Sequence, residues 1–166
     1  MKDERAQASV AAAWLIVANK PFYPLYVWWI AGRDAAFAAT PTMAGAIFYL
    51  AVPVIARRAD FLARVALVCV ALVDTLFATK LFGAAAGTEA FLFPCALLAF
   101  VCFSPRDHIS RRVLVALVFV AFLALHGRYG AALNGWPPQT AAKLLELDLY
   151  SAAALTAFLV WRFSRI

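Results

Sequence analysis

The chain has 166 residues, of which 66% are hydrophobic and 14% are charged. Soluble domains contain about 45–50% apolar and about 25% charged residues. A soluble fold of this length buries only about 70% of the surface that its unfolded chain exposes, so it could not hide this much apolar surface. Disordered chains are poor in aliphatic and aromatic residues. The mean hydropathy of +0.83 therefore predicts an integral membrane protein.

The formal net charge is +6, which in a soluble protein would suggest a nucleic-acid partner. Six spans of about 20 residues each use roughly 120 residues, and the remaining loops and tails are too short for a soluble catalytic or nucleic-acid-binding domain. Excess Lys and Arg instead follows the topology rule of membrane proteins. We therefore expect the lipid bilayer as a partner, and no nucleic acid.

Six apolar segments follow one another along the chain, and each has the composition of a membrane-spanning helix. We predict an all-α integral membrane protein, a compact bundle of six transmembrane helices in a single domain covering residues 1–166. Thr40, which precedes Pro41, and Thr88 are the expected N-caps of the second and fourth spans. The predicted spans are 9–31, 35–56, 61–83, 88–104, 111–127 and 142–163.

Basic residues alternate between the two ends of these spans. The side that holds both termini carries ten Lys and Arg residues, whereas the opposite side carries four. Because Lys and Arg in short loops stay in the cytoplasm, we expect both termini to be cytoplasmic in a bacterial-type inner (plasma) membrane. The ten residues are Lys2, Arg5, Arg57, Arg58, Arg64, Arg106, Arg111, Arg112, Arg162 and Arg165.

Two ionisable residues fall near the middle of predicted spans, Lys20 in the first and Asp74 in the third. Such groups cost at least about 2.5–3.5 kcal/mol at the bilayer centre and usually face a partner inside the bundle. Opposite charges at matched depth predict an ion pair. Three interpretations stay open: an inert staple between helices, a polar ligand-binding pocket or ion-linked switch, and two groups out of contact.

The segment 19–24, NKPFYP, interrupts the first span. Its two prolines each remove a backbone donor, so we expect unpaired carbonyls near residues 17 and 20 and a kinked or broken helix. Broken helices at membrane depth line substrate sites in transporters, although proline kinks also occur without such a role. Asn19 and Tyr23 therefore join the ion pair as candidate ligand-binding residues.

The outer ends of the predicted spans carry mixed charge. Glu89 begins the fourth span, and Glu146 and Asp148 begin the sixth. One interpretation is a vestibule, with Glu89 as a candidate site residue, that binds a small polar or cationic ligand. The other is a set of solvated helix ends at the headgroup level. Residues of similar depth are Asp34, Lys80, His126 and Arg128.

Residue types that carry metal or catalytic chemistry are scattered. Cys69, Cys95 and Cys102 lie in apolar segments without a CxxC pair. His108 and His126 sit at opposite ends of the fifth span, roughly 25 Å apart by helix rise, so they cannot share a metal or a haem iron. The sequence has no Gly-rich phosphate loop, GxSxG or HExxH motif. We expect no catalytic residue, no metal and no cofactor.

The predicted fourth span begins with an acidic residue, Glu89, in the segment 87–94 (GTEAFLFP). It ends in the segment 103–107 (FSPRD), and Arg111 and Arg112 follow. This pattern resembles the multi-helix membrane-associated sensor modules of bacterial nucleotide cyclases, diguanylate cyclases and histidine kinases. The resemblance implies a module that senses without doing chemistry. No output domain or coiled-coil linker follows the last span, so it implies a stand-alone sensor-like fragment or a partner of another protein.

Three functions stay open at this stage. The first is a sensor-like or accessory module that binds a small ligand or a membrane partner. The second is a small transporter or channel that works as an oligomer, although the second and fifth spans offer few polar side chains. The third is a structural or assembly subunit of a larger membrane complex, for which the small residues 44–46 and 152–154 would allow close helix packing. A membrane-protein partner or a homo-oligomer is expected in the last two cases.

Overall fold

The computed structural model describes residues 3–164, so Lys2 and Arg165, which contribute to the charge pattern above, lie outside the described residues. All regular elements in this range are helical. The α-helices are α1 (Glu4–Asn19), α2 (Tyr23–Ala31), α3 (Arg33–Ala39), α4 (Gly45–Ile55), α5 (Asp60–Phe82), α6 (Leu92–Val101), α7 (His108–Leu125) and α8 (Pro138–Phe163). The short 3₁₀ helices are η1 (Lys20–Phe22), η2 (Thr40–Ala44), η3 (Ala84–Ala86), η4 (Thr88–Phe91) and η5 (Pro105–Asp107).

These elements follow one another as six helical segments, because η1 joins α1 to α2, η2 joins α3 to α4, η4 leads into α6 and η5 leads into α7. Four long apolar helices suggest a multi-pass membrane protein. The fourth segment, Thr88–Val101, is apolar but shorter. The four helices long and apolar enough to cross a membrane are Arg33–Ile55, Asp60–Phe82, Pro105–Leu125 and Pro138–Phe163.

Thr40 and Thr88 are not the N-cap residues of helices, so these two predictions are wrong. The Thr40 hydroxyl donates to the carbonyl of Phe37 at 2.8 Å, within a helical stretch that has already begun. The Thr88 hydroxyl donates to Oγ1 of Thr79 at 3.1 Å, and Gly87 takes the cap position. Threonine hydroxyls inside helices commonly bond back to a carbonyl of the preceding turn, and the sequence pattern does not separate this use from capping.

The last two helices begin earlier than predicted. α7 starts at His108 rather than at residue 111, directly after a capping box in which Ser104 and Asp107 bond each other's backbone and side chains. α8 starts at Pro138 rather than at residue 142. Proline is favoured at the first helical position because its fixed φ suits the helix and its missing donor is not needed there.

The first helical segment changes from an α-helix to the 3₁₀ turn η1 at its prolines, as the expected interruption requires, but it keeps the hydrogen bonds around Lys20. The backbone N–H of Lys20 donates to the carbonyl of Ile16, and the N–H of Tyr23 donates to the carbonyl of Lys20. The expected unpaired carbonyl at residue 20 is therefore wrong. The tighter spacing of the 3₁₀ turn lets Tyr23 supply the donor that Pro24 lacks.

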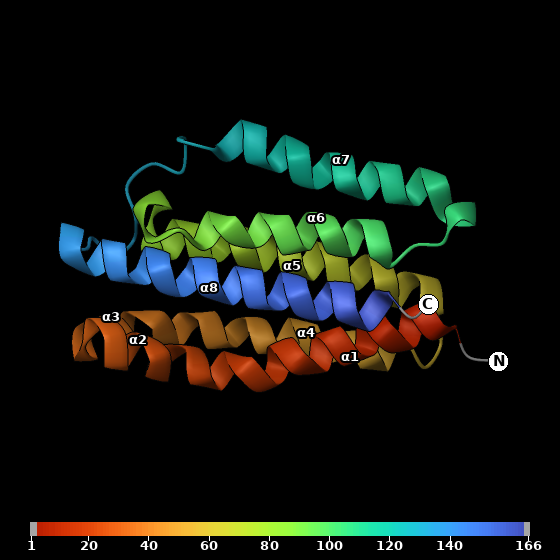
Figure 1. Cartoon of the computed structure of the whole chain (residues 1–166), viewed down its shortest axis with the longest axis horizontal. Coiled ribbons are helices and arrows are strands. Elements are labelled where there is room, and N and C mark those ends of the chain that lie inside the picture. Colours follow the sequence, from red (N-terminus) through yellow and green to blue (C-terminus); the bar gives the residue numbers. More distant parts are fainter. Residues whose placement is uncertain (1–2, 165–166) are drawn as a thin grey trace.

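Figure 1 shows how the segments are layered. α1 to α4 form one side of the bundle, α5, α6 and α8 form its middle, and α7 lies on the far side. α7 packs mainly against α6 and buries only Leu114 and Val118. α1 begins and α8 ends at the same end of the bundle (Figure 1).

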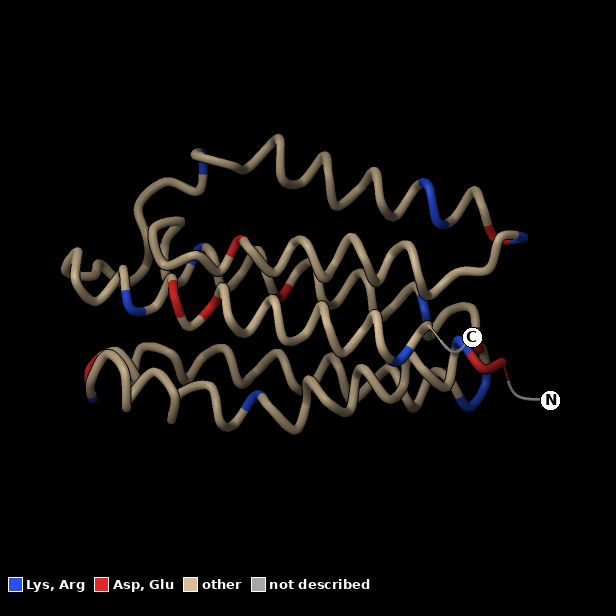
Figure 2. Tube along the Cα trace, in the orientation of Figure 1, with Lys and Arg blue, Asp and Glu red and all other residues tan. Residues whose placement is uncertain are grey.

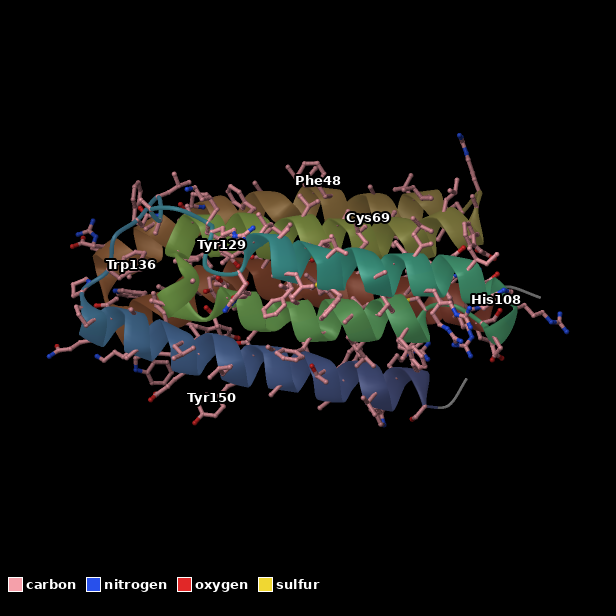
Figure 3. All side chains as sticks on the ribbon, turned by 90° about the horizontal axis from the view of Figure 1, so that it is seen from above. Phe48, Cys69, His108, Tyr129, Trp136 and Tyr150 are labelled. Atoms are coloured by element: carbon pink, nitrogen blue, oxygen red, sulfur yellow. The ribbon has the colours of Figure 1, made fainter. Side chains whose placement is uncertain are left out.

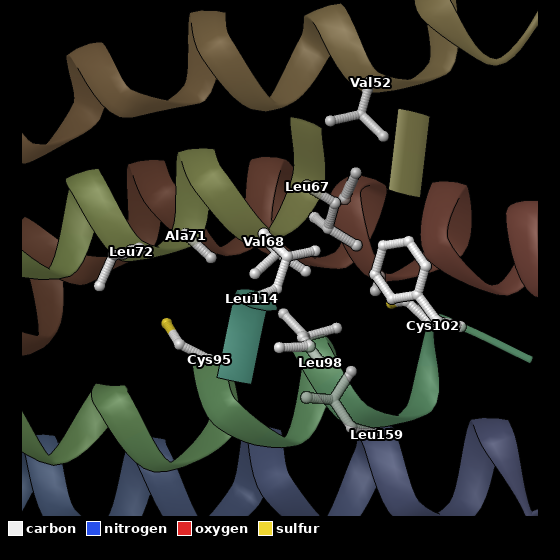
Figure 4. Close-up of a cluster of buried hydrophobic side chains, with 14 of the residues drawn as sticks. Val52, Leu67, Val68, Ala71, Leu72, Cys95, Leu98, Cys102, Leu114 and Leu159 are labelled. Carbon is white, nitrogen blue, oxygen red and sulfur yellow. The ribbon is translucent and has the colours of Figure 1, made fainter. Parts of the chain in front are cut away.

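An apolar core forms where α1, α4, α5, α6, α7 and α8 meet (Figure 4). Leu67, Val68, Leu98 and Leu159 are buried there. α1 contributes mainly alanines, which let the backbones of neighbouring helices approach closely, as in other membrane bundles. This core fills the half of the bundle that contains the chain termini.

The outside of the bundle is apolar. Phe48 and Tyr150 point away from the helices in Figure 3, and Trp29 is 89% exposed. Charged residues gather mostly toward the two ends (Figure 2). A soluble protein rarely exposes so continuous an apolar surface, whereas a surface in contact with lipid requires it.

A buried arginine joins three segments at the end where α1 begins. The Arg64 guanidinium lies 3.3 Å from Oδ2 of Asp3 and 3.4 Å from Oδ2 of Asp107, and it donates to the carbonyl of Cys102. The charge pattern predicts that Arg64 lies in a cytoplasmic loop, which is wrong: it lies in α5 and is 6% exposed. It ties the start of the chain to α5 and to the connection between α6 and α7.

The long connection between α7 and α8 is fastened to the opposite end of α5. Nζ of Lys80 donates to the carbonyls of Tyr129 and Ala131, both at 2.8 Å. The Trp136 ring stacks on Phe82 with centroids 6.0 Å apart. In Figure 3, Trp136 and His108 lie at opposite ends of the molecule. This connection therefore packs against the bundle and helps to fix the start of α8.

Candidate functional site

A cavity of about 470 Å³ lies inside the bundle, in the part not filled by the apolar core. Residues from α1, α2, α4, α5, α6 and α8 line it, together with residues from η1, η2 and η4. Most of its wall is apolar, as at Leu98 and Leu155. Its polar groups come chiefly from three places: an ion pair, a tyrosine–aspartate pair and the side chain of Asn19.

The ion pair joins the first helical segment to α5. Nζ of Lys20 lies 2.6 Å from Oδ2 of Asp74 and 2.7 Å from Oδ1. Their side chains are 12% and 15% exposed. The Tyr49 hydroxyl of α4 donates to Oδ2 of Asp74 at 3.3 Å, and the Tyr49 ring centroid is 6.0 Å from the lysine nitrogen. The structure thus brings together the two charges whose matched depth suggested a pair, and adds a tyrosine from the second segment.

The backbone of α4 leaves no room for a side chain beside this pair. A Cβ atom built on Gly45 would overlap Oδ1 of Asp74 and would lie 3.1 Å from Nζ of Lys20. Gly45 has ordinary helical dihedral angles, so glycine is needed here for space and not for conformation. Gly45, within the small-residue segment 44–46, therefore lets α4 approach the charged pair that α5 and the first helical segment carry.

Asp148 of α8 forms the second polar group with Tyr23. The Tyr23 hydroxyl donates to Oδ1 of Asp148 at 3.0 Å. Asp148 is 0% exposed, and its Oδ2 has no hydrogen-bond partner among residues 3–164. Tyr23 was a candidate from the sequence, and this contact adds Asp148 to the same cavity.

The prediction that Asp148 belongs to a solvated helix end at the outer surface is wrong. α8 starts at Pro138, so Asp148 lies ten residues into the helix, which is about 15 Å along its axis. Glu146, two residues earlier, is exposed because it lies on a different face of the same helix. The proline at the first helical position was the signal in the sequence that could have placed Asp148 correctly.

The cavity opens toward the side of the bundle. Asn19, Tyr26 and Ala154 line the cavity and are also exposed, as is Leu15. They belong to α1, α2 and α8, which lie beside one another in Figure 1. The opening therefore lies between the first helical segment and α8, on the apolar flank of the molecule.

Glu89 is not part of this cavity. Its Oε2 lies 2.8 Å from Nδ1 of His126, and its Oε1 accepts a hydrogen bond from the Tyr129 hydroxyl at 3.4 Å. Burial and the neighbouring carboxylate of Glu89 raise the pKa of Tyr129 above 10.0. Glu89 therefore fastens the connection between α7 and α8, apart from the cavity that Lys20 and Asp74 line.

No group of three His, Cys, Asp or Glu side chains within residues 3–164 is placed to hold a metal ion. The sulfur of Cys95 lies 3.6 Å from Oγ1 of Thr75, and that of Cys102 accepts a hydrogen bond from the Ser9 hydroxyl. All three cysteines are free thiols. The groups that line the cavity can bind a molecule through charge, hydrogen bonds and apolar contact.

No family model matches the chain, and neither a curated protein nor a solved structure matches it.

Proposed function

We propose that this chain is a non-enzymatic inner-membrane protein with six spans, a sensor-like or accessory module that binds a small amphiphilic molecule inside its helix bundle. The observation that supports the proposal most is the cavity of about 470 Å³. Ligand cavities in proteins commonly measure about 300–1,000 Å³ and have apolar walls with a few placed polar groups. The cavity has this composition.

The position of the chain ends supports six spans with both termini in the cytoplasm. α1 begins and α8 ends at the same end of the bundle (Figure 1), as an even number of spans requires. The exposed Arg57, Arg58 and Arg106 lie in the connections at this end. Because basic residues in short loops stay in the cytoplasm, we assign this end to the cytoplasm.

The side opening suggests that the ligand comes from the membrane. Leu15 and Tyr26, which border it, are 39% and 40% exposed on the apolar flank. A molecule dissolved in the bilayer can enter there without crossing the charged ends. An apolar body would occupy the wall near Leu155, and a polar head would reach the tyrosine and aspartate side chains.

The Lys20–Asp74 pair has two roles in this proposal. It joins the first segment to α5 with two contacts of 2.6 and 2.7 Å, which fixes one side of the cavity. It also provides part of the polar wall. The pair can therefore both hold two helices together and contribute to ligand binding, because the residues that line a cavity must be held in place.

The proposal is tested by filling the mouth of the cavity. Ala154 lines the cavity and Ala153 does not, and both are exposed residues of α8. Protein purified from its native membrane is analysed by native mass spectrometry as wild type, Ala154→Trp and Ala153→Trp. We expect a bound small molecule in the wild type and in Ala153→Trp, and its loss in Ala154→Trp.

Equal occupancy in all three proteins, or no bound molecule in the wild type, would contradict the proposal. A transporter is distinguished by one further measurement, because it would move the identified molecule across liposome membranes and a binding module would not. A second protein that co-purifies in fixed proportion while the cavity is empty would instead favour an assembly subunit.

A further inference from the structure

We infer that the ligand of this cavity carries a protonated amine that binds the carboxylate of Asp148. The inference rests on the proposed function, since it names the class of molecule that the same cavity takes. It depends on the charges of the cavity wall, on one buried carboxylate oxygen without a partner in the described chain, and on the aromatic side chains that line the same cavity.

The charges of the wall leave a single negative group unpaired. Three charged side chains line the cavity, namely Lys20, Asp74 and Asp148. Lys20 and Asp74 neutralise each other at 2.6 Å. No Lys, Arg or His of the described chain lies within 4.0 Å of the Asp148 carboxylate. The cavity therefore has a net negative charge when Asp148 is ionised.

One oxygen of Asp148 still requires a donor. Tyr23 occupies Oδ1 at 3.0 Å, whereas Oδ2 is buried and has no partner within residues 3–164. Buried polar atoms in folded proteins nearly always have a hydrogen-bond partner, so a ligand that donates to Oδ2 would gain a hydrogen bond that the described residues do not supply. Asp148 lines the cavity and is 0% exposed, so a donor approaches it from the cavity.

The neighbouring aromatic side chains favour a cation over a neutral donor. Tyr23, Tyr26, Phe91 and Phe158 line the same cavity. The faces of aromatic rings attract ammonium groups at distances up to about 6 Å. An anionic headgroup would face both the ring electrons and the Asp148 carboxylate, and it would be repelled.

The test uses three probes with the same apolar chain and different headgroups: dodecylamine, dodecanol and dodecanoic acid. The full chain is placed in lipid nanodiscs, and saturable binding of each tritiated probe is measured after subtraction of binding to empty nanodiscs. We expect the amine to bind about tenfold or more tightly than the alcohol, which corresponds to one charge-assisted hydrogen bond. The acid is expected to bind most weakly.

The variant Asp148→Asn, with Glu146→Gln as its control, identifies the group that recognises the amine. Both substitutions replace a carboxylate by an amide in α8, but Glu146 is exposed and does not line the cavity. Asp148→Asn is expected to lose the preference for amine over alcohol and to bind dodecanol within about twofold of the wild type. Glu146→Gln is expected to keep the full preference.

The outcomes separate this inference from the proposed function. If dodecanol binds saturably and dodecylamine binds no better, the amine inference fails and the cavity proposal stands. The inference also fails if Asp148→Asn keeps the wild-type preference. If none of the three probes binds saturably, both fail. The comparison of headgroups on the wild-type protein requires no variant, so it decides the question even if Asp148→Asn is poorly folded.

Discussion

Gly45 of α4 lies directly against the carboxylate of Asp74, so closely that a Cβ atom there would overlap Oδ1. The same Cβ would lie 3.1 Å from Nζ of Lys20. The contact explains how a third helix encloses an ion pair that two other helices form. It also explains why this stretch of α4 has a glycine where the backbone itself would accept any residue.

We therefore predict that Gly45→Ala destabilises the protein by about 1–3 kcal/mol, the usual cost of overpacking a filled site. The measurement is the midpoint of thermal unfolding in a mild detergent. Gly135→Ala is the control, because a Cβ at Gly135 would meet nothing within 4 Å. Equal stability of the two variants would show that α4 does not pack against the pair.

The ion pair itself gives a second prediction. Lys20→Met and Asp74→Asn are each expected to lower the free energy of unfolding by about 3 kcal/mol, because each leaves a buried charge without its partner. The double variant should recover most of that loss. A double variant whose loss equals the sum of the two single losses would mean that the groups do not interact.

Substitution of Asp148 should stabilise the protein, whereas substitution of Lys20 or Asp74 should destabilise it. Oδ2 of Asp148 is buried and has no hydrogen-bond partner within residues 3–164. Asp148→Asn is therefore expected to raise the free energy of unfolding by about 1 kcal/mol, because an amide is less costly to bury than an unpaired charge. Glu146→Gln, at an exposed position, should change it little. A clear loss of stability in Asp148→Asn would indicate that the carboxylate already has a partner.

The connection between α7 and α8 supplies a prediction of pH dependence. Burial and the Glu89 carboxylate raise the pKa of Tyr129 above its ordinary value of 10.0. Above pH 10 the phenol of the unfolded chain loses its proton first, so stability is full below that pH and falls as the pH rises through the higher pKa of the folded state. Tyr129→Phe should reduce this alkaline loss of stability. Tyr150→Phe, at a side chain that points outward (Figure 3), should not.

Depth along a helix could be predicted from the sequence. The membrane character of the chain and the order of its six helical segments follow from apolar runs. Lys20 and Asp74 were matched because both lie near the middle of such runs. Depth says nothing of which face of a helix a residue occupies: Glu89 and His126 share a depth and are in contact at 2.8 Å, but Glu89 does not line the cavity.

The cavity could not be predicted in the same way. Asp148 was placed at the surface because the predicted start of α8 was residue 142, and a shift of one helical turn moves a residue from the headgroup level into the bundle. The role of Gly45 depends on the distance between helix backbones, and this distance could not be predicted from the apolar segments of the sequence. Tyr49 was missed because a tyrosine in an apolar span is usually placed at the lipid interface.

The most direct test of a lipid-side ligand cavity is photocrosslinking in the living cell. A diazirine-bearing amino acid replaces Leu155, which lines the cavity, or Leu149, which is 48% exposed on the same helix and does not line it. After irradiation, mass spectrometry identifies what is attached at each position. We expect one dominant amine-containing small molecule at position 155 that is absent at position 149. The same mixture of bulk phospholipids at both positions would contradict it.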